Sequence, residues 1–188
     1  QKQREKARED RKKKDISGWS EDLFGSLSAE PTEFVGYNTL ETSAKVLAIS
    51  DGEEMLDAVS TDDGPKEGIL VVLDKTPFYA EAGGQVGDMG FLTADGLRLK
   101  VIDCKKTPKG FYVHTCTLEN GLLMVGTELI ASVSKRIRMA VARNHTAAHL
   151  LQAALRQVLG MHVHQAGSYE DAQRVRFDFT HFGAVTPE

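Results

Sequence analysis

The stretch from residue 143 to residue 165 reads RNHTAAHLLQAALRQVLGMHVHQ and places His145 and His149 four positions apart. Apolar residues recur after the first histidine at helical spacing, namely Leu150, Leu151, Ala154, Leu155, Val158 and Leu159. This periodicity predicts an amphipathic helix, in which residues four apart lie on one face. We therefore expect both imidazoles to be close enough to bind one metal ion, while the Leu-rich face packs against a core.

The histidine pair alone does not establish a metal site, because pairs at this spacing also occur on solvated helices. Zinc proteases place a glutamate directly after the first histidine as the general base. Here that position is Thr146. Two imidazoles also leave a tetrahedral zinc two ligands short, and neither Cys104 nor Cys116 lies in an obvious metal motif. The residues predict half a metal site and argue against a zinc protease.

Two blocks of sequence resemble the editing region of the alanyl-tRNA synthetase family and its free-standing editing relatives. The downstream block comprises HTAAHLL at 145–151, LGMHVHQAGS at 159–168 and RFDF at 176–179. The upstream block, LDKTPFYAEAGGQVGDMG, occupies 73–90. The blocks follow the family's order, and the resemblance covers essentially the whole chain. The second metal motif of the family, Cys-x-x-x-His, would follow residue 188, so the resemblance implies a piece of a larger synthetase.

The resemblance implies an ATP-dependent alanine–tRNA ligase whose editing site hydrolyses serine or glycine esters of the tRNA for alanine. It implies a zinc ion on His145 and His149, with further Cys and His ligands downstream of Glu188. Catalytic roles are expected for Gln165, Arg176, Asp178 and Thr146. Contacts to the acceptor end of the tRNA are expected from Gly83, Gly84, Gln85 and Arg143. We expect the 188-residue piece to be inactive alone and to hold zinc weakly or not at all.

Each of these assignments has a purely structural alternative. The glycine block 83–90 lacks the Lys-Ser/Thr of a phosphate-binding P-loop, so it is also compatible with a tight turn that needs positive φ. Its bare N–H groups suit a phosphate or an RNA end. Gln165 is compatible with a surface residue, and Arg176 with a surface pair to Asp178. The histidines at 162, 164 and 181 have no expected partner.

One position departs from the family pattern. The residue before the second metal histidine is commonly threonine in the family, and its hydroxyl suits recognition of serine. Here it is Ala148. A site that hydrogen-bonds the serine hydroxyl would reject alanine well, because its polar groups would stay unpaired. Either Thr146 or a downstream group therefore senses serine, or the selectivity for serine is weaker.

Composition and charge restrict the class of protein. Of the 188 residues, 41% are apolar and 27% are charged, as in ordinary soluble domains. Two cysteines make no disulfide framework, so a cytoplasmic location is expected. Residues 1–15 carry eight basic and four acidic residues, which leaves 15 basic and 23 acidic residues elsewhere. Because the body is acidic, we expect any contact with RNA to be local and no DNA partner. The longest aliphatic run, Ile69–Leu73, is too short to span a membrane, so no membrane partner is expected. The tRNA for alanine is the partner that the resemblance implies.

The sequence divides into three predicted segments. Residues 1–31 are polar and are predicted to form a linker, which Trp19, Leu23 and Phe24 dock on the body. The resemblance implies that this linker is partly helical and leaves a preceding tRNA-recognition region. Residues 32–133 contain short apolar runs between turn signals and are predicted to form a small β-barrel, of translation-factor type by resemblance. The expected strands are Ser43–Ile49, Glu54–Val59, Gly68–Leu73, Gly90–Thr93, Leu97–Cys104, Phe111–Leu118 and Glu128–Val133.

Residues 134–188 are predicted to begin an α+β editing core. Ser134 is the expected N-cap of a helix that runs to Leu159, and Gly160 ends it. A hairpin should follow, with strands 161–169 and 174–180 around a turn at 170–173. The predicted class is therefore α+β, a barrel followed by a helix and a hairpin. The glycine block is expected at the junction between them.

Two other functions compete with the editing module. One is a non-catalytic RNA-binding or spacer module, and the other is an unrelated metallohydrolase. The missing glutamate after His145 already disfavours the second. The threonyl-tRNA editing domain shares a histidine pair, but the glycine block and the Pro77–Glu81 segment favour the alanyl family.

Overall fold

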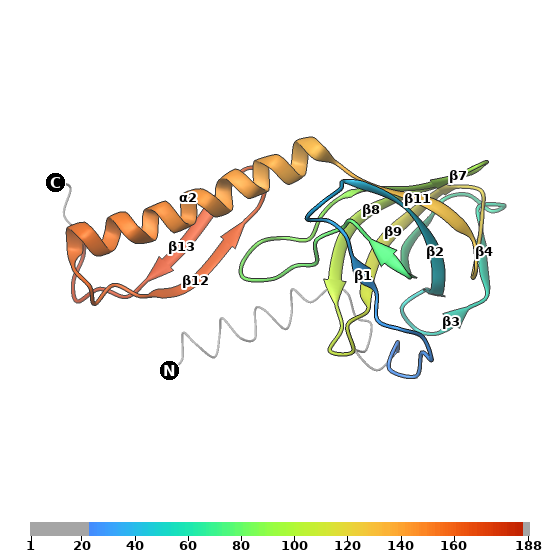
Figure 1. Ribbon diagram of the computed structural model, residues 1–188, viewed down its shortest axis with the longest axis horizontal. Helices are drawn as coiled ribbons and strands as arrows, with labels where there is room; N and C mark the ends of the chain where they lie inside the picture. Colours follow the sequence, from blue (N-terminus) through green and yellow to red (C-terminus); the bar gives the residue numbers. More distant parts are fainter. Residues whose placement is uncertain (1–22, 186–188) are drawn as a thin grey trace.

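The computed structural model describes residues 23–185 (Figure 1). A β-barrel occupies one end of the molecule, and helix α2 with a two-stranded hairpin extends from it to the other (Figure 1). The expectations for residues 1–15 and for Trp19 lie outside the described residues. Within residues 23–185, no helix is both long and apolar enough to cross a membrane.

Six antiparallel strands close the barrel. In order around it they are β2 (Glu41–Ser50), β5 (Lys66–Leu73), β9 (Tyr112–Asn120), β8 (Leu97–Lys106), β7 (Gly90–Ala94) and β11 (Glu128–Val133). β11 pairs with β7 on one side and with β2 on the other. These pairings leave no free edge between the six strands, which avoids edge-to-edge association. The predicted barrel is confirmed.

The remaining barrel strands are two or three residues long. They are β1 (Glu33–Phe34), β3 (Met55–Leu56), β4 (Ala58–Ser60), β6 (Lys75–Thr76) and β10 (Leu122–Met124). The single strand predicted at Glu54–Val59 is wrong, because the chain there forms β3, which pairs with β2, and β4, which pairs with β10. Strands β1, β6 and β10 were not predicted, since segments this short show no alternation.

Two apolar clusters stabilise the barrel. The inner one is built from alternate residues of the strands and includes Val46, Leu73, Leu99 and Leu118. The outer cluster packs Phe24 over Ala48, Leu70, Val72, Phe111 and Val113. Strand β5 thus has apolar neighbours on both faces, which explains its unbroken run from Ile69 to Leu73. The predicted docking of Phe24 is confirmed, and Leu23 packs against the same cluster.

Helix α2 spans Lys135–Leu159, as predicted from its caps. The Ser134 side chain makes no capping hydrogen bond, and its backbone N–H donates instead to the Met89 carbonyl at 2.8 Å. The described part of α2 buries Val141 and Ala148, while Leu150 and Val158 are 67% and 81% exposed. Much of the Leu-rich face of α2 is therefore uncovered within residues 23–185.

The hairpin consists of β12 (Gln165–Glu170) and β13 (Val175–Phe179), which pair in antiparallel register. The turn begins one residue later than predicted, because Glu170 is the last residue of β12 and is buried. Asp171 nucleates the turn: its Oδ1 accepts hydrogen bonds from the N–H groups of Gln173 and Arg174. The described chain is thus mostly β, with one helix and a hairpin beside the barrel.

Candidate functional site

His145 and His149 meet on one face of α2. Their ring centroids are 4.8 Å apart at an interplanar angle of 73°, and the two Nε2 atoms are 3.1 Å apart. The expected shared face is confirmed. Zinc–imidazole bonds of about 2.0–2.1 Å in a tetrahedral site would put two such nitrogens about 3.4 Å apart. The pair therefore fits two positions of a zinc site, although zinc binding itself stays a prediction.

No third ligand joins the pair within residues 23–185, where no three His, Cys, Asp or Glu side chains converge. Both cysteines lie fully buried inside the barrel. Burial raises the pKa of the Cys116 thiol far above its ordinary value, and burial also raises the pKa of Cys104, with Asp103 adding to the effect. Because thiolates bind metals, these buried thiols do not complete the site.

Glu170 contacts the opposite side of the His145 ring. Its carboxylate Oε2 lies 3.5 Å from His145 Nδ1, and its side chain is 1% exposed. Neither atom has a hydrogen-bond partner. Sequence reasoning missed this residue because it expected Glu170 in an exposed turn. No local signal marks it, because the burial of β12 does not alternate along the strand.

The glycine block packs against the hairpin. The N–H of Glu170 donates to the Gly84 carbonyl at 2.8 Å, and the N–H of Val86 donates to the Glu170 carbonyl at 3.1 Å. A Cβ on Gly84 would lie 2.2 Å from Ser168 Oγ, and Gly84 has a φ of +90°. Only glycine tolerates this approach together with that φ. The expected position of the block beside residues 145–165 is confirmed.

The remaining predicted residues fall into two groups. Gln165 donates from Nε2 to Ser168 Oγ at 2.9 Å, and Ser168 Oγ donates in turn to the Gly83 carbonyl at 3.4 Å. Gln165 is thus joined to the glycine block, in which Gln85 forms a bridge with β12.

The other group consists of exposed residues whose polar contacts lie within their own helix or strand. Arg176 and Asp178 form an exposed pair on β13, with Nε and Oδ2 3.3 Å apart. The Thr146 hydroxyl donates to the Ala142 carbonyl of its own helix at 3.0 Å. Arg143 is exposed on α2.

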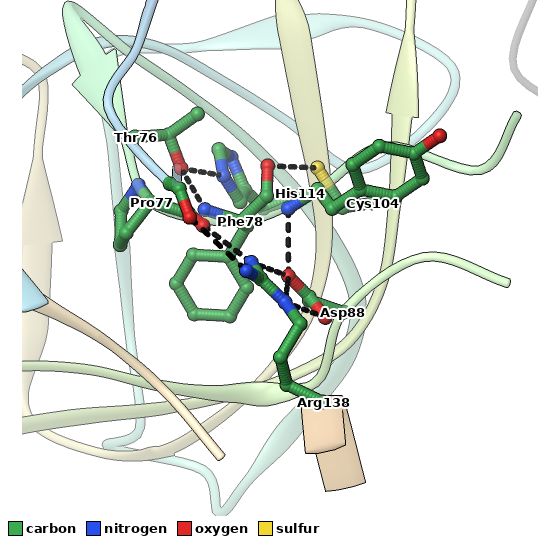
Figure 2. Close-up of polar contacts among 9 residues, drawn as sticks. Thr76, Pro77, Phe78, Asp88, Cys104, His114 and Arg138 are labelled. Carbon is green, nitrogen blue, oxygen red and sulfur yellow. Dashed lines mark hydrogen bonds and ion pairs between the residues drawn. The ribbon is translucent and has the colours of Figure 1, made fainter. Parts of the chain in front are cut away.

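Two further contacts were not predicted. The Arg138 guanidinium at the start of α2 binds the Asp88 carboxylate and the carbonyls of Gly36 and Pro77, as Figure 2 shows for the labelled partners. His162 Nε2 lies 2.8 Å from His181 Nδ1, and the rings are stacked. The sequence alone suggests no partner for either of these histidines. Both contacts join residues distant in the sequence, which periodicity does not reveal.

Comparison with known proteins places this chain in a family. The family model described as tRNA synthetases class II (A) matches residues 1–137, and the chain belongs to this family.

Its relatives specify the kind of synthetase. The chain is 50% identical over 183 residues to the alanine–tRNA ligase of Acetivibrio thermocellus, an alignment that covers 97% of this chain and 20% of the relative. It is 47% identical over 188 residues to that of Thermoanaerobacter sp. (strain X514), covering 100% and 21%. It is 49% identical over 168 residues to that of Thermus thermophilus, covering 89% and 18%. The chain thus spans about a fifth of the length of these relatives. The predicted resemblance to the alanyl-tRNA synthetase family is confirmed.

Proposed function

We propose that this chain is part of a cytoplasmic alanine–tRNA ligase and forms the first part of its editing site. The observation that carries the proposal is the convergence of the His145 and His149 Nε2 atoms at 3.1 Å. The hairpin and the glycine block lie against the same helix face through Glu170. The alanine–tRNA ligase relatives support the ligase assignment.

In this proposal the substrate is tRNA for alanine that carries serine or glycine. A zinc ion on His145 and His149 would supply electrostatic activation of the ester or of a water when bound. Gln165 and the exposed backbone at Gly83 would hold the terminal nucleotide, because they lie together through Ser168. The exposed guanidinium groups of Arg143 and Arg176 would bind phosphates of the acceptor end.

Serine recognition requires a hydroxyl or amide that faces the substrate. Ala148 is buried in α2 and carries no hydrogen-bonding group. The Thr146 hydroxyl must rotate away from the Ala142 carbonyl before it can take this role. We therefore propose that selectivity for serine over alanine depends on Thr146 or on a group outside residues 23–185.

The proposed organisation has a barrel unit at residues 32–133 and an editing unit that begins at residue 134, preceded by a linker over residues 1–31. The barrel has a closed set of strand pairings and an apolar core of its own. Helix α2, by contrast, has only two buried residues in the described part of the chain. The barrel would then act as a platform for the editing helix, which is fixed to it at Arg138.

The test compares the 188-residue chain with the full-length alanine–tRNA ligase of Acetivibrio thermocellus on tRNA for alanine mischarged with serine. We expect the full-length protein to release serine and the 188-residue chain to be far slower, because two imidazoles hold zinc weakly. His149→Ala at the matching position of the full-length protein should abolish release.

Three outcomes would contradict the proposal. Full release by the His149→Ala protein would remove the histidine pair from the chemistry. Retained tRNA binding without release by either protein would identify the region as a non-catalytic RNA-binding module. Turnover by the 188-residue chain equal to that of the full-length protein would mean that the histidine pair suffices without further metal ligands.

A further inference from the structure

The two nitrogens of the His145 ring face different polar groups, the His149 ring and the Glu170 carboxylate. On one side its Nε2 is 3.1 Å from His149 Nε2, and on the other its Nδ1 is 3.5 Å from Glu170 Oε2. A neutral imidazole carries its proton on one nitrogen only. If the proton is on Nδ1, it faces the carboxylate, and Nε2 keeps the lone pair that a metal ion requires.

Glu170 needs a partner of this kind. Its side chain is 1% exposed, and Oε2 has no hydrogen-bond partner. A buried carboxylate without a donor is strongly unfavourable. Among the described residues, His145 is the basic side chain found within 4.0 Å of this carboxylate. The Nδ1 atom of His145 is likewise buried and has no hydrogen-bond partner. A protonated Nδ1 is a donor, and the carboxylate oxygen is an acceptor.

The carboxylate is held in place from outside the helix. The backbone N–H and C=O of Glu170 are both bound by the glycine block, through Gly84 and Val86. A Cβ on Gly84 would approach Glu170 Oε2 to 3.0 Å, so the absence of a side chain there leaves room for the carboxylate. The glycine block therefore sets where the carboxylate lies relative to His145.

We propose that Glu170 is a positioning residue for His145: it accepts the Nδ1 proton and thereby keeps Nε2 unprotonated and directed at His149. Carboxylates that bind the second nitrogen of a metal-ligating histidine fix its tautomer and orientation in many metal sites. The inference rests on the proposed function in one respect, that zinc is the ion bound by His145 and His149. It assigns Glu170 no contact with substrate.

The first measurement is the protonation of the ring nitrogens in the zinc-free 188-residue chain, by ¹⁵N-edited NMR of the histidine rings at pH 8. We expect His145 to be in the Nδ1–H form. Glu170→Leu should move the proton to Nε2 in a substantial part of the molecules. Glu170→Gln keeps an oxygen that can accept the Nδ1 proton, so it should largely retain the wild-type form. Glu119→Gln, which removes an exposed carboxylate on the barrel, is the matched control and should change nothing.

The second measurement is zinc affinity of the same proteins, by competition with a chromophoric chelator. Glu170→Leu should weaken binding about 10- to 100-fold, the usual cost of losing such a partner. Glu170→Gln should weaken it less. Amide spectra that match the wild type show that the variants are folded. Where Glu170→Leu does not fold, the tautomer of His145 in the wild type decides the question.

The outcomes separate this inference from the proposed function. A proton on His145 Nε2 in the wild type, or a tautomer that is unchanged in both Glu170 variants, overturns the role of Glu170 even if the wild type binds zinc. A tautomer that depends on Glu170 supports the role whether or not the 188-residue chain binds zinc, whereas failure of the full-length protein to bind zinc would remove the metal assignment in the proposed function instead.

Discussion

Arg138 in the first turns of α2 forms a two-pronged ion pair with Asp88 of the glycine block. Its Nε lies 2.8 Å and 2.7 Å from the two carboxylate oxygens, and the Asp88 side chain is 3% exposed. The same carboxylate accepts the N–H of Tyr79 at 2.7 Å. The guanidinium also binds the carbonyl of Gly36 and that of Pro77, the latter shown in Figure 2. One side chain thus ties the helix to three segments of the barrel.

Removal of this arginine should be strongly destabilising. Arg138→Met leaves the Asp88 carboxylate buried without its cation, and breaking one partner of a buried pair costs about 3–5 kcal/mol. The free energy of unfolding, from urea denaturation followed by circular dichroism, measures the loss. Glu119→Gln breaks the exposed pair with Arg98 and should cost less than about 1 kcal/mol. Equal losses in the two variants would show that the buried pair contributes no more than a surface one.

Acid should destabilise the barrel through His114. This histidine is fully buried on β9, with Nε2 2.8 Å from Thr76 Oγ1 and Nδ1 3.0 Å from the Val71 carbonyl. Burial lowers its pKa from 6.5 to about 4. Below pH 6.5, His114 binds a proton in the unfolded chain but stays neutral in the folded chain until about pH 4. The free energy of unfolding therefore falls as the pH falls from about 6.5 to 4. His114 should lower the free energy of unfolding by about 3 kcal/mol over that pH range.

The measurement is the urea midpoint of the wild type and of His114→Gln at pH values from 7.5 to 4.5. His114→Gln should be less stable at pH 7.5 but should lose less stability on acidification, because the proton uptake by residue 114 is gone. His164→Gln, a change of an exposed histidine on the chain before β12, serves as the control. Parallel pH dependences for the wild type and His114→Gln would refute the assignment.

Two adjacent glycines should differ in their tolerance of a side chain. Gly83 and Gly84 have φ values of +61° and +90°, so alanine is strained at both. A Cβ at Gly83 meets nothing within 4 Å, whereas at Gly84 it meets Ser168 Oγ at 2.2 Å. Gly84→Ala should therefore cost about 1–3 kcal/mol more than Gly83→Ala, the usual range for overpacking.

The readout for the glycine pair is the unfolding free energy together with hydrogen exchange of the Glu170 amide, which is bonded to the Gly84 carbonyl. Exchange at Glu170 should accelerate in Gly84→Ala and stay near the wild-type rate in Gly83→Ala. Equal costs and equal exchange rates would mean that the hairpin does not approach the glycine block as closely as this.

Features with local signals were predictable from the sequence. The bounds of α2 followed from a Ser before it, a Gly after it and its periodicity. The barrel followed from short apolar runs between turn dipeptides. Both depend on residues close together in the chain, where spacing carries the information.

Features that join distant residues were not predictable. Arg138 and Asp88 are 50 positions apart, and each is ordinary in its own segment. Glu170 lies in the sequence Glu-Asp-Ala-Gln, whose polarity suggests a turn, and only the neighbouring Gly84 backbone explains its burial. The histidine pair was found because the helix itself brings the two residues together. The ring-binding carboxylate was missed because a different element supplies it.

The exposed apolar face of α2 should drive self-association of the 188-residue chain. Leu150, Leu151 and Val158 all lie on this helix with large exposed fractions, and contiguous apolar surface of this kind favours association. Burying one such side chain is worth about 1.5–3 kcal/mol, so Val158→Lys should weaken association by about tenfold or more.

Sedimentation velocity over a range of concentrations measures the association constant. Leu122→Lys, a change of an exposed leucine on β10, is the matched control and should leave association unchanged. If the wild type stays monomeric at high concentration, or if both variants weaken association equally, the helix face is not the contact. A weakening confined to Val158→Lys would locate the contact on α2, the helix that also carries the histidine pair.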